Sequence, residues 1–145
     1  MKEGRIGSLL LIFYKLKYGN LNKEDMEGSL LAKNYLARSS ARVLDAKNAL
    51  RSGARSYSLE YCKGAIELII KACLTFKAIP CEGRLEDITE ENKEALPRQL
   101  REVVDKALSL LKNLREERIA EQINEVDELG KRAAMIIHAS EREHV

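Results

Sequence analysis

The amino-acid sequence predicts an all-α protein, an up-and-down four-helix bundle with a possible fifth short helix and an N-terminal extension. The chain has two prolines, no tryptophan and many Leu, Ala, Glu, Lys and Arg residues, a composition typical of helical proteins. Its most apolar long segment, Ser58–Ile79, places apolar residues around most of a helical circumference, which predicts a central helix buried on several sides. Two later segments repeat apolar residues at helical spacing, which predicts helices that pack around it.

The composition also limits the classes of function. A chain of 145 residues with 45% hydrophobic and 33% charged residues fits one soluble globular domain with a substantial core. The net charge of +2 is too small to indicate nucleic-acid binding by itself, so only a local basic patch could do so. Charges interrupt Ser58–Ile79, which argues against a membrane span.

The three cysteines, Cys62, Cys73 and Cys81, form no C-x-x-C pair. Two of them lie in the predicted central helix, where cysteine acts as a small hydrophobic residue. We therefore expect a reducing, cytoplasmic compartment, no metal site and no cofactor.

Residues 1–21 are interpreted as an apolar N-terminal arm or short helix that docks on the bundle formed by residues 22–145. The apolar run Leu9–Tyr14 is short and charged residues follow it at once. It also lacks an evident small-residue cleavage site, so the arm is favoured over a signal peptide. This run is a candidate interface.

The first long helix is expected at Lys23–Arg51, with Asn22 as its N-cap and Gly53 at the C′ position. The short connection that follows makes this helix and the central helix antiparallel neighbours. Pro80 and the residues after it are expected to close the central helix.

A short turn of helix is expected at Thr89–Glu94, and Pro97 is suited to the first position of the next helix, Pro97–Leu114. The chain should turn near residues 115–118 and continue as a last helix, Ile119–Glu143, with one apolar face. Gly130 inside that helix costs about 1 kcal/mol relative to alanine.

A set of residues in the first two helices resembles the HEPN domain (higher eukaryotes and prokaryotes nucleotide-binding) of the prokaryotic single-domain type. The resemblance covers about residues 22–80 and rests on Ala46, Leu50, Gly53, Tyr57, Tyr61, Ala65, Glu67, Lys71 and Ala72. We expect Ala65, Glu67, Lys71 and Ala72 to be structural: the two alanines allow close helix approach, and Glu67 and Lys71 form an i,i+4 pair.

The last helix carries Arg132 and His138 in the pattern R-x5-H. Many HEPN domains have a similar R-x(4–6)-H motif, which is associated with metal-independent cleavage of RNA. The resemblance implies that His138 acts as general base or acid at a ribose 2′-hydroxyl or leaving oxygen, and that Arg132 stabilises phosphate charge. The expected product is a 2′,3′-cyclic phosphate.

Helical phase places Arg132 and His138 about 120° apart, so they cannot converge within one straight helix. In the family the site is generally completed across a dimer. Lys131, His138 and Arg142 cluster better by phase, as a small basic patch for phosphate or nucleotide. Met135 lies opposite the apolar face and indicates a contact with a second copy in a twofold dimer.

These observations leave three hypotheses open, and the sequence does not decide whether the chain is an enzyme. The first is a nucleotide- or RNA-associated dimeric module that works with a minimal nucleotidyltransferase partner in a toxin–antitoxin-like pair. The second is a metal-independent endoribonuclease that uses Arg132 and His138. The third is a purely structural helical oligomer. Ala133 favours the first over the second, because the family usually has a polar residue directly after the arginine.

Overall fold

The computed structural model of the chain describes residues 23–80, 85, 88 and 90–142. The predicted arm, Asn22 and Cys81 lie outside the described residues. The described secondary structure is helical throughout: α2 (Lys23–Arg51), α3 (Arg55–Phe76), α4 (Glu90–Glu94), α5 (Arg98–Lys112), the 3-10 helix η2 (Glu116–Arg118) and α6 (Ile119–Arg142).

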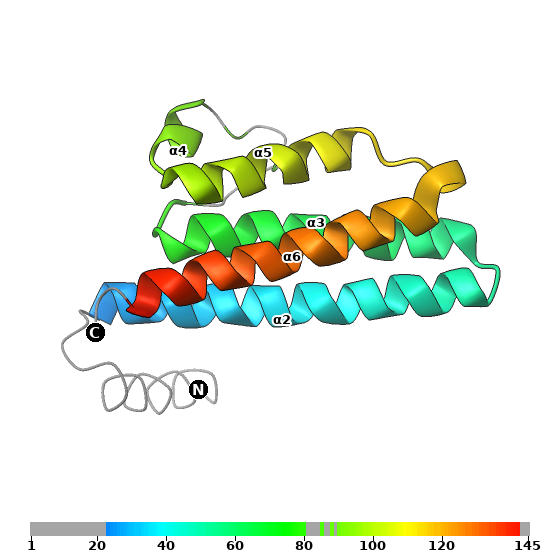
Figure 1. The fold of residues 1–145 in the computed structure, drawn as a ribbon, viewed down its shortest axis with the longest axis horizontal. Coiled ribbons are helices and arrows are strands. Elements are labelled where there is room, and N and C mark those ends of the chain that lie inside the picture. Colours follow the sequence, from blue (N-terminus) through cyan, green and yellow to red (C-terminus); the bar gives the residue numbers. More distant parts are fainter. Residues whose placement is uncertain (1–22, 81–84, 86–87, 89, 143–145) are drawn as a thin grey trace.

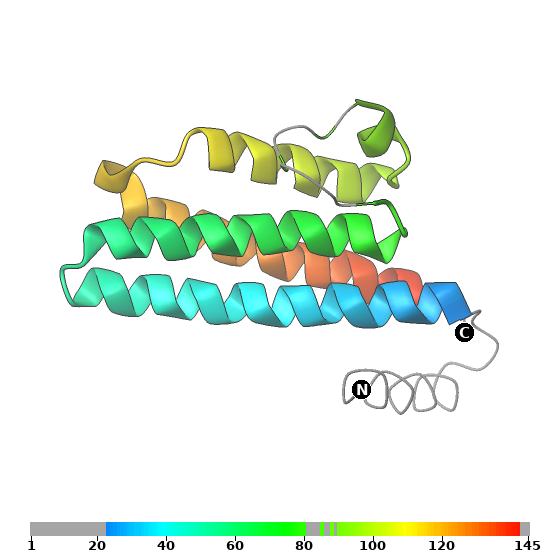
Figure 2. The same cartoon turned by 180° about the vertical axis from the view of Figure 1, so that it is seen from behind.

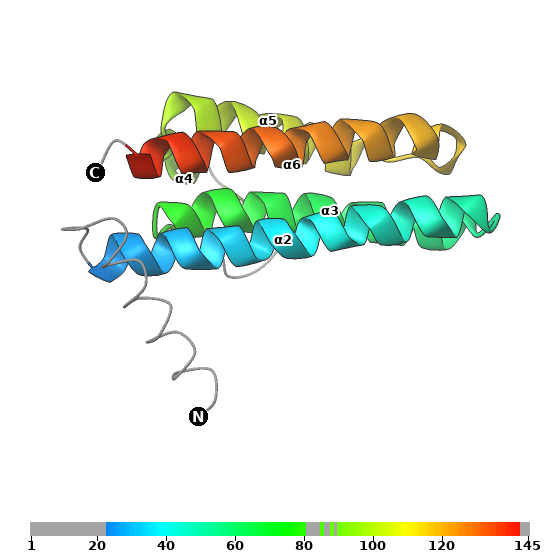
Figure 3. The same ribbon diagram turned by 60° about the horizontal axis from the view of Figure 1, so that its bottom comes forward.

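The four long helices form an antiparallel bundle, which confirms the predicted fold class. Successive long helices alternate in direction, and α4 is a short additional turn that packs on α5 (Figure 1). The pair α2 and α3 forms one layer and the pair α5 and α6 forms the other (Figure 3). Among the described residues, none of the helices has the length and apolarity needed to cross a membrane.

Helix α3 is the centre of the bundle, as its sequence predicts. It contacts α2, α5 and α6, and its side chains are buried on several sides. Its fully buried residues with large side chains include Ile66, Ile69, Ile70 and Leu74. The burial of apolar surface from all four long helices therefore depends on this one element.

The predicted bounds of the central helix are shifted by three residues at each end. The helix begins at Arg55 rather than Ser58, and it ends at Phe76 rather than Ile79. Ala78 adopts the left-handed conformation with φ 54°, which closes the helix before Pro80 is reached. The Ala78 and Ile79 amides donate to the Thr75 and Leu74 carbonyls at 3.0 and 2.9 Å, the pattern of a Schellman cap.

The connection from α2 to α3 follows the sequence prediction. Gly53 has φ 78°, and its amide donates to the Leu50 carbonyl at 3.0 Å. The Ala54 amide donates to the Ala49 carbonyl at 2.8 Å, so this end is also a Schellman cap with glycine at C′. The chain then reverses direction and α3 packs back along α2.

Helices α2 and α3 approach closely because small residues line their contact. Ala32, Ala46, Ala65 and Ala72 are all fully buried. At one end of the contact, a Cβ added at Gly28 would lie 2.9 Å from the Thr75 carbonyl oxygen.

Two buried serines form hydrogen bonds between the same two helices, α2 and α3. The Ser39 Oγ donates to the Ala65 carbonyl at 2.9 Å, and the Ser58 Oγ donates to the Ala46 carbonyl at 2.8 Å. Each hydroxyl thus reaches a helix backbone of the neighbouring element, which satisfies a buried polar group and fixes the register of α2 against α3.

The second half of the chain also follows the predicted order, with one correction. Helix α4 corresponds to the predicted turn at Thr89–Glu94, and η2 lies where a turn was expected. Pro97 is the N-cap of α5 with ψ 150°, not its first helical residue, because its backbone is extended. Gln122 fastens the link to α6: its Oε1 accepts from the Arg115 amide and its Nε2 donates to the Asn113 carbonyl, both at 3.1 Å.

A buried polar cluster joins the start of α2 to the end of α6. The Glu141 side chain is 2% exposed, and its Oε2 lies 2.8 Å from the Lys33 Nζ. Its Oε1 accepts a hydrogen bond from the Ser29 hydroxyl. These contacts between residues more than 100 positions apart in the sequence hold α6 against α2 at this end of the bundle.

Candidate functional site on the last helix

Arg132 lies on the side of α6 that faces α5. Its Nη2 is 3.4 Å from the Glu102 Oε2, and both side chains are 45% exposed. The other oxygen of Glu102 lies 3.5 Å from the Arg98 Nε. Arg132 is thus partly neutralised by a carboxylate of its own chain, while its guanidinium remains accessible to solvent.

The surroundings of Arg132 form a groove of about 390 Å³ between α5 and α6. Its lining includes two basic and two acidic side chains, so the groove does not present a uniformly positive surface to a phosphate. Its lining residues are Lys106, Ser109, Leu110, Glu125, Glu128, Leu129 and Arg132.

Lys131 lies on the side of α6 toward α2, in a groove of about 180 Å³. Its Nζ is 3.2 Å from the Asp127 Oδ2, and the same oxygen lies 3.8 Å from the Lys47 Nζ. Asp127 therefore offsets part of the positive charge of the predicted basic patch. The side chain of Arg142 lies outside the described ones, so its predicted contribution to the patch stays a prediction.

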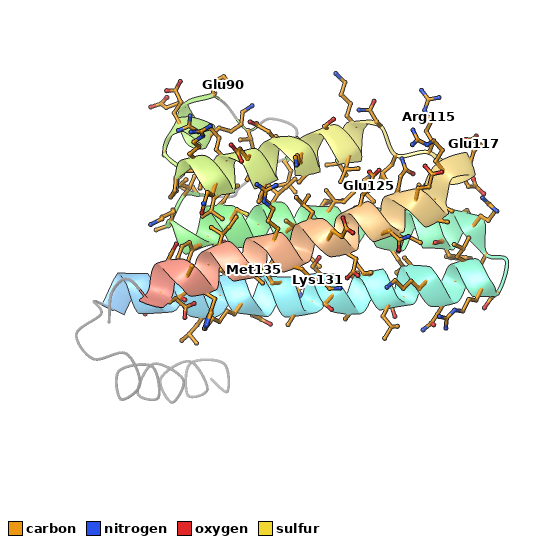
Figure 4. All side chains as sticks on the ribbon, viewed as in Figure 1. Glu90, Arg115, Glu117, Glu125, Lys131 and Met135 are labelled. Carbon is orange, nitrogen blue, oxygen red and sulfur yellow. The ribbon has the colours of Figure 1, made fainter. Side chains whose placement is uncertain are left out.

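His138 is exposed on α6. Helical phase places it on the side of Lys131 rather than the side of Arg132. Met135 lies halfway between Arg132 and His138 in the sequence and is 72% exposed. Lys131 and Met135 both lie on the exposed side of α6 (Figure 4). A single chain therefore presents Arg132 and His138 on opposite flanks of one exposed strip, and it does not bring them together.

The four α3 residues that were expected to be structural, Ala65, Glu67, Lys71 and Ala72, are buried or half-buried. Ala65 and Ala72 are fully buried at the contact with α2. Glu67 and Lys71 are half-buried. They stand four residues apart on α3, and no ion pair joins these two described side chains, so a stabilising interaction between them stays a prediction.

The cysteines of α3 are unsuited to nucleophilic chemistry. Burial, with a smaller effect from Glu125, raises the pKa of Cys62 to about 11. Burial raises the pKa of Cys73 to about 12. Both thiols are thus protonated near neutral pH. Within the described part of the chain, no three His, Cys, Asp or Glu side chains are grouped to hold a metal ion.

Two carboxylates that control the candidate site were absent from the sequence predictions. Asp127 precedes Lys131 by four residues, so the i,i+4 rule could have identified it. Glu102 lies 30 residues before Arg132 on another helix, and only the packing of α5 against α6 brings the two together.

Comparisons with protein-family models, with curated proteins and with solved structures find no match for this chain.

Proposed function

We propose that the chain is a non-catalytic, RNA- or nucleotide-associated module of HEPN type, which acts in the cytoplasm as a dimer with a minimal nucleotidyltransferase. The observation that supports the absence of catalysis is the separation of Arg132 and His138, which one chain presents on opposite flanks of α6. Glu102 adds a weaker effect, because its exposed contact with Arg132 at 3.4 Å places a carboxylate where a phosphate would bind. Ala133, which directly follows Arg132, is fully buried, so the polar residue usual at this position of the resembling family has no counterpart here.

The proposal predicts no turnover of RNA in the presence of EDTA, together with a stable complex with a co-expressed minimal nucleotidyltransferase or a thermal shift with nucleotide. Glu102→Gln is the informative variant, because it removes the carboxylate that competes for Arg132 while keeping a side chain of similar shape. The proposal fails if the unmodified protein cleaves RNA and His138→Ala abolishes that cleavage.

A second candidate function, a metal-independent endoribonuclease, is favoured by the position of Met135. Met135 is the midpoint between Arg132 and His138 and is the most exposed large apolar side chain among the described residues. If two copies of α6 pack antiparallel around a twofold axis at Met135, Arg132 of one copy lies level with His138 of the other. Each dimer would then contain two complete sites, each made of Arg132 from one chain and His138 from the other.

The two functions are separated by mixing inactive variants. If the site spans the dimer, Arg132→Ala and His138→Ala are each inactive alone. Their mixture regains about one quarter of the activity, because half of the randomly formed dimers are mixed and each mixed dimer has one intact site of two. A mixture as inactive as its components refutes a site shared between copies.

A further inference from the structure

The outer side of the contact between α2 and α3 carries aromatic and basic side chains in alternation. Figure 2 shows these two helices side by side in front of α6. Helical spacing places Tyr57 and Tyr61 on one face of α3, and Tyr35, Arg38 and Arg42 on the adjoining face of α2. We call these five residues the Tyr–Arg face.

One end of the Tyr–Arg face is hollowed. A depression of about 410 Å³ lies beside the link from α2 to α3, and Tyr57 and Tyr61 form its aromatic side. Tyr57 is 67% exposed, so most of its ring is open to a partner. The other lining residues are Asp45, Asn48, Ala49, Ser52 and Ala54.

The arginines of α2 lie over tyrosine rings rather than in strong ion pairs. The Arg38 Cζ is 5.6 Å from the centre of the Tyr35 ring, and the Arg42 Cζ is 5.8 Å from the centre of the Tyr61 ring. Arg42 also has an exposed contact of 3.4 Å to Asp45. A solvent-exposed contact of this length is weak, so a phosphate can replace it.

The polar groups of the depression suit the edge of a nucleobase. Asn48 offers an amide with both a donor and an acceptor, and Asp45 offers a carboxylate that accepts from an exocyclic amino group. Beyond Tyr61, a Cβ at Gly64 would meet no described atom within 4 Å, so the surface of α3 is open at this position.

We infer that the Tyr–Arg face binds an unpaired nucleic-acid strand, with a base stacked on Tyr57 and phosphates held by Arg42 and Arg38. Every base has a π face, so such a platform tolerates many sequences, and the arginines follow the backbone. A strand fits better than a duplex, whose bases are already stacked on one another. The inference rests on the proposed RNA association and adds a place on the fold, remote from Arg132 and His138, where the strand lies.

Fluorescence anisotropy with labelled, unstructured oligoribonucleotides and oligodeoxyribonucleotides tests the inference on the full chain. Tyr57→Ala should weaken binding about 5- to 150-fold, the range expected for one stacked base. Tyr57→Phe, which keeps the ring, should bind within about twofold of the unmodified protein. Arg42→Gln should weaken binding and reduce the slope of log K against log salt concentration by about 0.7.

Two control variants change residues outside the Tyr–Arg face. Leu44→Ala truncates another exposed side chain of α2, and Arg118→Gln removes a positive charge at η2. Both should bind like the unmodified protein. The RNA and DNA arms show which backbone is preferred, and a preference for either supports the inference.

The inference is overturned if Tyr57→Ala binds as tightly as the unmodified protein, if duplex RNA binds as tightly as the single strand, or if free AMP binds as tightly as the oligonucleotide. Absence of all oligonucleotide binding also overturns it, whereas the complex with a nucleotidyltransferase and the thermal shift with nucleotide test the proposed function separately. Because Tyr57 is largely exposed, its variants should fold, and circular dichroism before each titration verifies this.

Discussion

Gly28→Ala should destabilise the protein, whereas Gly64→Ala, the same change in α3, should stabilise it. Both residues lie inside helices, so alanine brings a gain of about 1 kcal/mol in helix propensity at each position. The difference between the two variants therefore comes from their surroundings and not from the helix itself.

At Gly28 a new Cβ would lie 2.9 Å from the Thr75 carbonyl oxygen and 3.1 Å from that of Phe76. Both are backbone atoms, so α2 and α3 must separate to relieve the contact. Overpacking of this kind costs about 1–3 kcal/mol. The net loss at Gly28 should be about 1 kcal/mol after the gain in propensity. At Gly64 a Cβ meets no described atom within 4 Å, so the full gain of about 1 kcal/mol should appear.

Urea denaturation followed by far-ultraviolet circular dichroism gives the free energy of unfolding of each variant. We expect Gly28→Ala and Gly64→Ala to differ by about 2 kcal/mol, which corresponds to about 4–8 °C in Tm for a chain of this size. If Gly28→Ala is stabilised as much as Gly64→Ala, α2 and α3 do not approach each other as closely as described.

Two further predictions concern the ends and the interior of the bundle. Ala78→Gly should stabilise the protein by about 1 kcal/mol in urea denaturation, because φ 54° strains alanine but not glycine, and a loss of stability would contradict the described cap. Burial and Glu125 raise the pKa of Cys62 from 9.0 to about 11, and burial raises the pKa of Cys73 from 9.0 to about 12. As pH rises, the folded protein therefore keeps protons on both thiols that the unfolded chain releases. Their stabilising contribution is complete below pH 9.0 and declines as pH rises toward these folded-state values; at pH about 10 the loss is about 1 kcal/mol per thiol. A Cys62→Ala, Cys73→Ala variant should lose this part of the pH dependence, and an equally steep decline in that variant would show that other groups cause it.

Much of the fold follows from local patterns in the sequence. The bounds of α2 agree with the prediction, because Gly53 supplies a strong local signal for the end of a helix. The start of α6 at Ile119 agrees as well, since its apolar residues recur at helical spacing. The end of α3 was misplaced because alanine at position 78 carries no sequence signal for the left-handed conformation that it adopts.

The candidate site was less accessible to prediction. Helical phase correctly separates Arg132 from His138 within one chain, since phase depends only on the helix that carries them. Helical phase does not identify the ion-pair partner of Arg132, Glu102. Glu102 is one of many acidic residues on other helices, and its selection depends on how α5 is rotated and placed against α6.

The sequence by itself determined the number and order of the long helices, the central place of Ser58–Ile79 and the divergence of Arg132 and His138. These properties depend on spacing along one helix and on the end signals of each helix. The tertiary structure decided which faces meet: it placed Glu102 beside Arg132, and it joined the tyrosines of α3 to the arginines of α2 in one surface. Such pairings depend on the rotation and separation of packed helices, which small buried residues and backbone approach control and which no local pattern records.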